Sequence, residues 1–236
     1  LVAGGTKGNG NRELYSVDDI MTTSLRTTEI YDPATDSWSA GPSMSMPKAG
    51  GASVALDTGE IMIAGGITFT SIFGIKIPDF ANDVQFYNPS TNSFRNKNMN
   101  EKRALFGMTK MANGKVLMSG GAGGDIFSIG PIVKQETYNP NNDNFASADP
   151  LTRAVAFSTS VALPDGTAMI VGGARGDLDN PIAVENVWIY DFTTNTTTEV
   201  SPMSVTRGGH VAVYTGAGNV VVFCGESDSG GSEATA

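Results

Sequence analysis

The chain is poor in the residues that build disulfide frameworks and metal centres. Its 236 residues include a single cysteine, Cys224, and a single histidine, His210. One cysteine excludes an internal disulfide framework and a zinc site made of thiolates. One histidine excludes any site that needs two histidine ligands from this chain. The sequence therefore predicts no metal site and no cofactor.

Basic residues and long apolar runs are also scarce. Fifteen Lys and Arg residues stand against 24 Asp and Glu, so the formal net charge is −9. Nucleic acids and anionic membrane surfaces both attract basic faces, and both are disfavoured as partners. The longest apolar run, Val220–Cys224, is far shorter than the ~18 residues of a membrane span. The 40% of hydrophobic residues is enough to build a packed core.

Internal repeats are the strongest feature that is present. Short apolar runs ending in a glycine pair recur with first glycines 61, 55 and 52 residues apart, at Leu1–Gly5, Ile61–Gly66, Val116–Gly121 and Met169–Gly173. A fifth, degraded run is Val220–Gly225. Tyrosines followed by Asp or Asn keep the same step, at Tyr31, Tyr87, Tyr138 and Tyr190. An aromatic residue stands seven positions after each of the first three, at Trp38, Phe94 and Phe145, and Thr197 takes that place in the fourth repeat. Basic residues form a third landmark, at Lys48, Arg103, Arg153 and Arg207.

Each repeat is predicted to contain four antiparallel strands. Turns such as Asp57-Thr58-Gly59 are typical of a tight hairpin between the first and second strands. The second strand is continuously apolar, which indicates that both of its faces are covered. The Tyr-Asp-Pro segment begins a turn between the third and fourth strands. A sheet of this kind buries both faces only by stacking on copies of itself, so the sequence predicts an all-β fold of the β-propeller type.

The glycine pair, the Tyr-Asp-Pro turn and the following Trp resemble the kelch repeat, most closely at Thr28–Trp38. The resemblance spans nearly the whole chain and implies a propeller of four-stranded kelch blades, with six or seven blades typical of the family. About four to five blades' worth is expected here, as repeats 1–47, 48–102, 103–152, 153–206 and a partial 207–226, with 227–236 a flexible tail or truncated loop. Seventeen strands are expected. Because the first and last repeats are incomplete, we expect the chain to be part of a larger ring, or a five-bladed ring with incomplete end blades, and missing chain or a second chain to cover the open end.

One face of the fold is predicted to carry the binding residues. The loops between the second and third strands differ among repeats and share a face with the loops that carry the basic landmark, and variable loops on a rigid scaffold are where binding sites concentrate. The candidate residues on this face are Lys48, Arg103, Arg153, Arg207, Phe73, Phe80, Arg175, Asp177 and Asp179. The basic landmark has a structural alternative, in which it pairs with Glu29 or Glu136 or points into the channel. Exposed apolar loop residues favour a protein contact, although a loop folded onto its own blade would bury them too.

Two short motifs have ordinary explanations. Arg175-Gly176-Asp177 has the form of an integrin-recognition tripeptide, but three residues match often by chance. Asn195-Thr196-Thr197 is a glycosylation sequon in a predicted turn, where Asn is also common for conformational reasons. The sequon, scarce Lys and many polar residues are typical of secreted proteins.

We therefore expect a non-catalytic binding or structural module that contacts a protein partner. A carbohydrate-binding or carbohydrate-active propeller, resembling galactose oxidase or the sialate mutarotases, and self-association are the alternatives. The copper site of galactose oxidase needs two histidines, so this chain does not contain it. Arg103, Arg153 and Arg207 could contribute to a sugar site, but no paired carboxylate for acid–base catalysis is evident.

Overall fold

The computed structural model describes residues 1–7, 23–125 and 128–227. The chain forms two compact units. Unit 1 consists of Leu1–Ala55 and Gly59–Ala104, and unit 2 consists of Leu56–Thr58 and Leu105–Ala236. Residues 228–236 of the predicted tail, and most of the first variable loop, lie outside the described residues.

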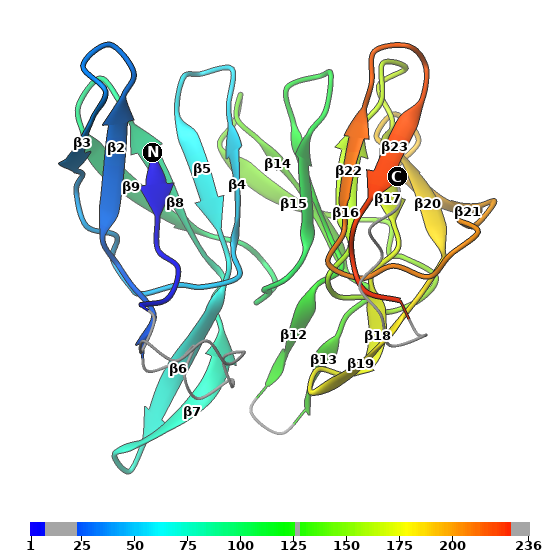
Figure 1. Ribbon diagram of the computed structural model, residues 1–236, viewed down its shortest axis with the longest axis horizontal. Coiled ribbons are helices and arrows are strands. Elements are labelled where there is room, and N and C mark those ends of the chain that lie inside the picture. Colours follow the sequence, from blue (N-terminus) through cyan, green and yellow to red (C-terminus); the bar gives the residue numbers. More distant parts are fainter. Residues whose placement is uncertain (8–22, 126–127, 228–236) are drawn as a thin grey trace. The chain divides into compact units, whose positions relative to one another are not determined.

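Unit 1 contains the first two repeats, each as an antiparallel sheet (Figure 1). The first sheet has the order β1-β2-β3 and consists of β1 (Val2–Ala3), β2 (Thr28–Asp32) and β3 (Ser37–Ala40). The second has the order β4-β5-β8-β9 and consists of β4 (Ala52–Ala55), β5 (Ile61–Ala64), β8 (Asp83–Asn88) and β9 (Ser93–Asn98). The strand order within each sheet is the one that the repeats predict.

Unit 2 contains the remaining repeats. One four-stranded sheet consists of β10 (Gly107–Lys110), β11 (Val116–Ser119), β14 (Gln135–Asn139) and β15 (Asn144–Ala148), and the next of β16 (Thr159–Ala162), β17 (Ala168–Val171), β20 (Val187–Asp191) and β21 (Thr196–Val200). A two-stranded sheet of β22 (Val211–Tyr214) and β23 (Val220–Phe223) follows. The seventeen predicted strands are therefore all present in the described residues.

Six further strands lie where the sequence predicts variable loops. They form the hairpins β6 (Ile67–Ile72) with β7 (Ile75–Phe80), β12 (Ala122–Asp125) with β13 (Ser128–Pro131), and β18 (Ala174–Asp177) with β19 (Asn180–Ala183). Each hairpin is inserted between the second and third strands of its sheet. Ladder hydrogen bonds satisfy the main chain of these insertions, so the segments are more regular than the predicted loops.

The tyrosine landmark begins the same turn in all four repeats. The tyrosine hydroxyl donates a hydrogen bond to the side-chain oxygen of the Asp or Asn five residues later, which has a positive φ. The pairs are Tyr31–Asp36 (2.8 Å, φ 48°), Tyr87–Asn92 (3.0 Å, 48°), Tyr138–Asp143 (2.7 Å, 52°) and Tyr190–Asn195 (3.0 Å, 52°). Asp and Asn are the non-glycine residues that adopt this left-handed conformation most readily, which explains why they stand there.

The glycine pair joins each repeat to the next through main-chain hydrogen bonds. The N–H of the second glycine donates to the carbonyl of a residue at the start of the following repeat: Gly5 to Lys48 (2.9 Å), Gly66 to Arg103 (2.9 Å), Gly121 to Val155 (2.8 Å) and Gly173 to Arg207 (2.8 Å). The second glycine has a φ between +90° and +119° in every case. This backbone conformation is open to glycine and costly for other residues, so the pair is a structural requirement of the repeat.

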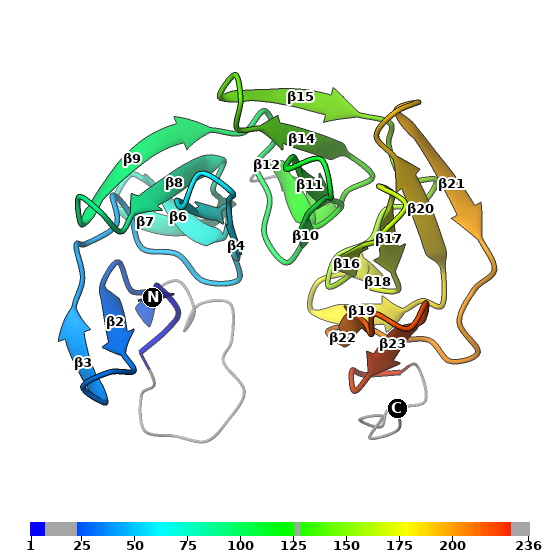
Figure 2. The ribbon, with the colours of Figure 1, turned by 90° about the horizontal axis from the view of Figure 1, so that it is seen from above.

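The first strands of the sheets in unit 2 lie side by side, with β10 next to β16 and β16 next to β22 (Figure 2). A second set of main-chain contacts links the same sheets. Phe157 N–H donates to Leu105 O over 2.7 Å, and Gly209 N–H donates to Phe157 O over 3.0 Å. All three residues have a positive φ, between 55° and 65°. Successive sheets of unit 2 thus meet along their first strands.

The core of unit 2 lies between these sheets. Trp188 and Tyr190 of β20 pack against Met111 and Leu117 of the preceding repeat, and all four are at most 1% exposed. A smaller cluster places Val161 and Val187 against Ala212 of β22. Thr197, which replaces the aromatic residue of the other repeats, instead donates a hydrogen bond to Asp149 O over 2.8 Å and accepts one from Gln135 Nε2 over 2.7 Å. The loss of the aromatic residue at position 197 predicts a looser contact between neighbouring repeats, whereas the structure shows a contact made by these two hydrogen bonds.

Candidate functional site

The β6–β7 hairpin of unit 1 ends in an exposed apolar tip. Ile72 pairs with Ile75, so the connecting turn consists of Phe73 and Gly74. Both have a positive φ, of 50° and 82°, as a two-residue hairpin turn of type I′ requires. A bulky aromatic residue adopts this conformation rarely. The Phe73 side chain is 102% exposed and that of Ile75 is 67% exposed, so the tip presents apolar surface to solvent.

The base of this hairpin is held by one carboxylate. Asp79 accepts hydrogen bonds from Lys102 Nζ at 2.8 Å, from Thr70 Oγ1 at 2.9 Å and from the Phe80 N–H at 2.8 Å. Burial by itself raises the pKa of Asp79, but these hydrogen bonds and the charge of Lys102 outweigh it, and the pKa lies below its usual value. Asp79 therefore stays ionised and holds both strands of the hairpin.

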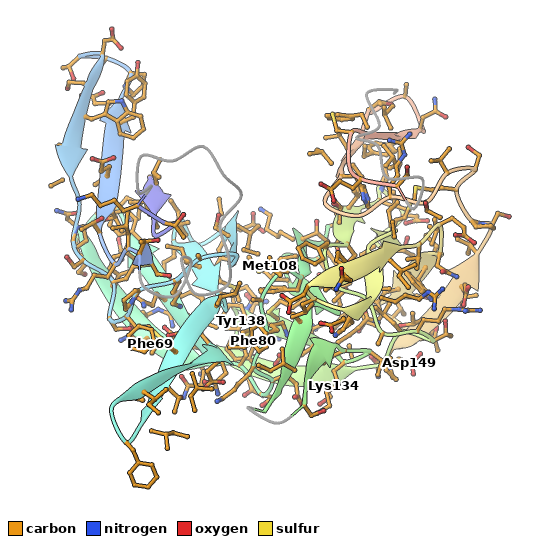
Figure 3. The ribbon with its side chains drawn as sticks, turned by 60° about the horizontal axis from the view of Figure 1, so that its bottom comes forward. Phe69, Phe80, Met108, Lys134, Tyr138 and Asp149 are labelled. Carbon is orange, nitrogen blue, oxygen red and sulfur yellow. The ribbon has the colours of Figure 1, made fainter. Side chains whose placement is uncertain are left out.

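The structure separates the two phenylalanines predicted for the binding face. Phe73 lies at the tip, whereas Phe80 is at the base and only 4% exposed. Figure 3 shows Phe80 with Phe69 on the two strands of the hairpin. Phe80 therefore anchors the hairpin, and Phe73 is available to a partner.

Two shorter hairpins lie next to each other in unit 2, with β13 beside β18. Arg175 and Asp177 are exposed on β18, so the Arg-Gly-Asp tripeptide lies along a strand. Asp177 accepts a hydrogen bond from the N–H of Asp179 over 3.2 Å, which fixes the turn to β19. Ile182 on β19 and Ile129 on β13 are each 39% exposed.

A pocket of about 740 Å³ opens beside the β18–β19 hairpin. Its lining includes Phe157, Asp179, Pro181, Ile182 and Glu226, together with several glycines. Among the described residues that line it, two are acidic and none is basic. The pocket therefore favours a cationic group or a hydrogen-bond donor over an anion. Asp179 is the predicted site residue that faces this pocket.

Lys48 is buried, at 3% exposure. Its Nζ lies 2.7 Å from Asp83 Oδ2 and donates to Asp83 O over 3.1 Å. Burial lowers the pKa of Lys48 below its usual value, and the attraction of Asp83 offsets only part of this effect. The ion pair is made with Asp83, at the start of the third strand, whereas the sequence suggests Glu29 or Glu136.

The other basic landmarks divide into buried and exposed positions. Arg103 is 0% exposed and Arg207 is 8% exposed. The Arg207 guanidinium donates to Cys224 O over 2.7 Å, which fixes the chain just after β23.

His210 is buried close to Arg207. Burial lowers the pKa of His210, and the charge of Arg207 lowers it further. A hydrogen bond with the Arg207 main chain acts in the opposite direction.

Arg153 does not occupy the position of the other three. In its repeat the carbonyl that accepts the glycine hydrogen bond belongs to Val155, two residues later. Arg153 is 64% exposed, and its Nε lies 3.8 Å from Glu199 Oε1. The spacing of the glycine pairs already favours Val155, because 103 to 155 is 52 residues and 120 to 172 is also 52. The basic landmark of the sequence is therefore a property of three repeats.

Asn195, the glycosylation candidate, is exposed in the turn between β20 and β21. Its Oδ1 accepts hydrogen bonds from Tyr190 Oη over 3.0 Å and from the Asp149 N–H over 3.2 Å. In the other repeats, the side-chain oxygen of the equivalent Asp or Asn accepts the same hydrogen bond from the tyrosine hydroxyl. The turn alone is thus a sufficient reason for Asn195, and glycosylation stays a prediction.

Within the described ranges, no group of three His, Cys, Asp or Glu side chains is placed to hold a metal ion. No helix in the same ranges has the length and apolar character needed to cross a bilayer. The side chains that do lie together are the partners of ion pairs, the polar residues of the turns, and the apolar residues at the tip of the β6–β7 hairpin.

The sheets, turns and glycine junctions define the fold as an all-β propeller of four-stranded antiparallel blades, and the predicted resemblance to kelch-repeat propellers is confirmed. The family model described as Kelch motif matches residues 1–45. Kelch-like protein 28 of Mus musculus and that of Homo sapiens are each 30% identical to this chain over 104 residues. The match covers 44% of this chain and 18% of each relative.

The solved structure of YjhT is similar to this chain in fold, with a TM-score of 0.60. The similarity covers 89% of this chain and 87% of that one, at 15% sequence identity. At this identity the likeness extends to the architecture only. These comparisons therefore support the kelch-type repeat and its sheet architecture.

Proposed function

We propose that this chain is a non-catalytic protein-binding module, and that the tip of the β6–β7 hairpin is its main contact. The observation that carries the proposal is the complete exposure of Phe73 beside the exposed Ile75. Burying a phenylalanine side chain against a partner contributes roughly 1.5–3 kcal/mol. Large anchors of this kind dominate the energetics of many protein interfaces.

The hairpin is suited to this role because its tip is exposed and its base is fixed. Asp79 ties β6 and β7 to Lys102, and Phe80 is buried beneath them. A rigid support lowers the entropy that is lost when a partner binds. Phe73 also adopts its left-handed conformation at a backbone cost that its own packing does not offset, because the side chain is fully exposed.

The basic residues do not favour a catalytic alternative. Lys48 is bound to Asp83 and Arg207 to the Cys224 carbonyl, and both are buried. Their charges are therefore used within the fold. A role for the exposed Arg175 and Asp177 as secondary contacts is part of the same proposal, as is the pocket beside Asp179.

Site-specific crosslinking tests the proposal. Cys224 is exposed and is first replaced by serine. Phe73→Cys then carries a benzophenone probe, and Thr91→Cys, in the exposed turn between β8 and β9, is the matched control. In an extract of the source organism we expect a discrete crosslinked protein from position 73 that is absent from position 91.

The captured protein is then measured against unlabelled variants. Phe73→Ser should weaken its affinity at least tenfold, whereas Val200→Ser, which removes an apolar side chain that is 37% exposed in unit 2, should leave it unchanged. Equal crosslinking from both positions, or an affinity that Phe73→Ser does not alter, would contradict the proposal.

A further inference from the structure

Lys102 forms an ion pair in which the cation is accessible to solvent and the carboxylate is enclosed. It lies in the segment between β9 and β10, and its Nζ donates to both oxygens of Asp79, over 3.0 Å and 2.8 Å. The Lys102 side chain is 47% exposed, whereas that of Asp79, on β7, is 11% exposed. A dissolved reagent can therefore reach the partner that carries the positive charge.

Two other lysine pairs lack this combination. Lys48 and Asp83 are both enclosed, with side chains 3% and 13% exposed, so that lysine is closed to a reagent. Lys110 and Asp57 are both open, with side chains 32% and 66% exposed, so loss of the lysine charge leaves a carboxylate that water solvates. At Lys102, by contrast, loss of the charge leaves an enclosed carboxylate without this cation.

The Lys102 pair fixes the hairpin that carries the exposed tip. Asp79 also accepts hydrogen bonds from Thr70 Oγ1 on β6 and from the Phe80 N–H at the base of β7. One carboxylate thus connects both strands to a segment that lies outside the hairpin. Phe80 is buried at the base, so a carboxylate that turns towards water after losing its cation moves the chain next to this anchor.

We propose that Lys102 is a lysine-acylation site, and that its modification loosens the β6–β7 hairpin and weakens binding at the tip. The co-reactant is an activated acyl donor, either a thioester or an acyl phosphate. The ammonium first releases a proton to water, and the Nζ lone pair then attacks the acyl carbon. A C–N bond forms, the bond to the thiolate or phosphate breaks with its electron pair on that leaving group, and a second proton passes from nitrogen to solvent. The product amide is neutral, so it does not replace the ammonium beside Asp79.

This inference rests on the proposed role of the hairpin tip in binding. Acylation of Lys102 changes no atom of Phe73 or Ile75, so its effect on binding is transmitted through the base of the hairpin. A hairpin that is no longer held at its base loses more conformational entropy when a partner immobilises it. The affinity for the partner therefore falls.

Reaction of the folded chain with acetyl phosphate, followed by peptide mass spectrometry, tests the site. We expect acetylation of Lys102 and of the exposed Lys134, and none of the enclosed Lys48 in the same time. Unfolding the chain in urea should make Lys48 reactive, because its protection comes from the fold. A Lys102 that stays unmodified while Lys134 reacts overturns the inference.

Hydrogen exchange then measures the hairpin itself. Nε-acetyl-lysine, placed at position 102 by an expanded genetic code, should speed amide exchange in β6 and β7 about tenfold, and Lys102→Gln should do the same. Lys102→Arg keeps the charge and should exchange like the unmodified chain. Lys110→Gln removes the lysine of an open pair and is the matched control, with no change in either hairpin strand. Combining Lys102→Gln with Asp79→Asn should restore slow exchange, because no enclosed charge remains.

Affinity for the protein captured through position 73 is the last measurement. Acetylation at position 102 should weaken it about tenfold, and Lys102→Arg should not. Hairpin exchange that acetylation leaves unchanged overturns the inference, and so does a double variant that exchanges as fast as Lys102→Gln. Faster exchange with unchanged affinity overturns the control of binding and leaves the role of Phe73 intact. If Phe73→Ser does not alter the affinity, the proposed function fails, whereas the acetylation and exchange results still decide whether Lys102 holds the hairpin.

Discussion

The hydroxyl of Tyr138 donates a 2.7 Å hydrogen bond to Asp143 Oδ1, and the aspartate holds a φ of 52°. Tyr138 is fully buried, and the bond that it donates to Asp143 is partly buried. We expect Tyr138→Phe to lower the free energy of unfolding by about 1 kcal/mol, because a partly buried acceptor loses this hydrogen bond. Urea denaturation measures this change. The same bond in the first repeat joins Tyr31, which is 40% exposed, and Tyr31→Phe should have a much smaller effect.

The buried ion pair between Lys48 and Asp83 gives a second prediction. Lys48→Met leaves the Asp83 carboxylate without its cation, with only the hydrogen bond from Gln85 Nε2, and should destabilise the fold by about 3–5 kcal/mol. Combining it with Asp83→Leu should recover most of that loss, because no unpaired charge remains. Arg95→Met breaks the exposed pair with Glu60, where Arg95 is 41% exposed, and should cost less than about 1 kcal/mol. A double variant as unstable as Lys48→Met would show that the pair is not the cause.

Variants of Asn195 distinguish two reasons for an asparagine at this position, the geometry of the turn and glycosylation. Asn195→Asp keeps the acceptor for Tyr190 and removes the sequon, so stability should be preserved, as Asp143 already shows in its own repeat. Asn195→Ala removes the acceptor and strains the left-handed backbone, and should cost roughly 1–3 kcal/mol. Mass spectrometry of protein from a glycosylating host measures whether a glycan is attached to the unmodified chain. Equal losses from both variants would argue against the turn as the reason for Asn195.

The buried His210 predicts a pH dependence of stability. Its pKa in the folded state lies below the ordinary value of 6.5, chiefly because of burial. At a pH between the folded-state pKa and 6.5, the histidine is protonated in the unfolded chain and neutral in the folded one, so the unfolded chain binds more protons. Stability therefore falls as the pH drops from 6.5 towards the folded-state pKa, with a slope of at most about 1.4 kcal/mol per pH unit. Subtracting the urea midpoints of His210→Gln from those of the unmodified chain isolates this contribution, and a difference that is flat below pH 6.5 would contradict it.

The repeated landmarks were sufficient to predict the sheets because each one has a local backbone cause. The second glycine of each pair needs a φ that other residues avoid, and Asp143 and its equivalents need a left-handed turn. Such requirements appear in the sequence whatever the tertiary context is. The strands next to them, such as β5 and β8, consequently lie where the sequence predicts them.

The inserted hairpins were harder to predict because their turns lack the usual residues. Phe73-Gly74 places an aromatic residue where Asn or Asp is common. Alternating apolar residues at Ile67 and Phe69, and again at Ile75 and Ile77, were the available signal for β6 and β7. The burial of Phe80, in contrast with the exposure of Phe73, depends on packing that no local pattern reports.

The basic landmark misled for a different reason. Lys48, Arg103 and Arg207 are aligned by the glycine junctions, but those junctions use the main-chain carbonyl and accept Val155 equally well. A basic side chain is therefore not required at this position, although three of the four repeats have one. The burial of Lys48 depends on its partner Asp83. The positions equivalent to Asp83 in the next two repeats hold Lys134 and Asn186, which cannot pair with a cation in this way.

Main-chain groups make the hydrogen bonds that run from the second glycine of one repeat to the first residues of the next. The fold can therefore accept a duplicated repeat without matching changes of side chains elsewhere in the protein. Chains of this type can lengthen or shorten by whole repeats, while selection acts separately on the hairpin that each copy carries.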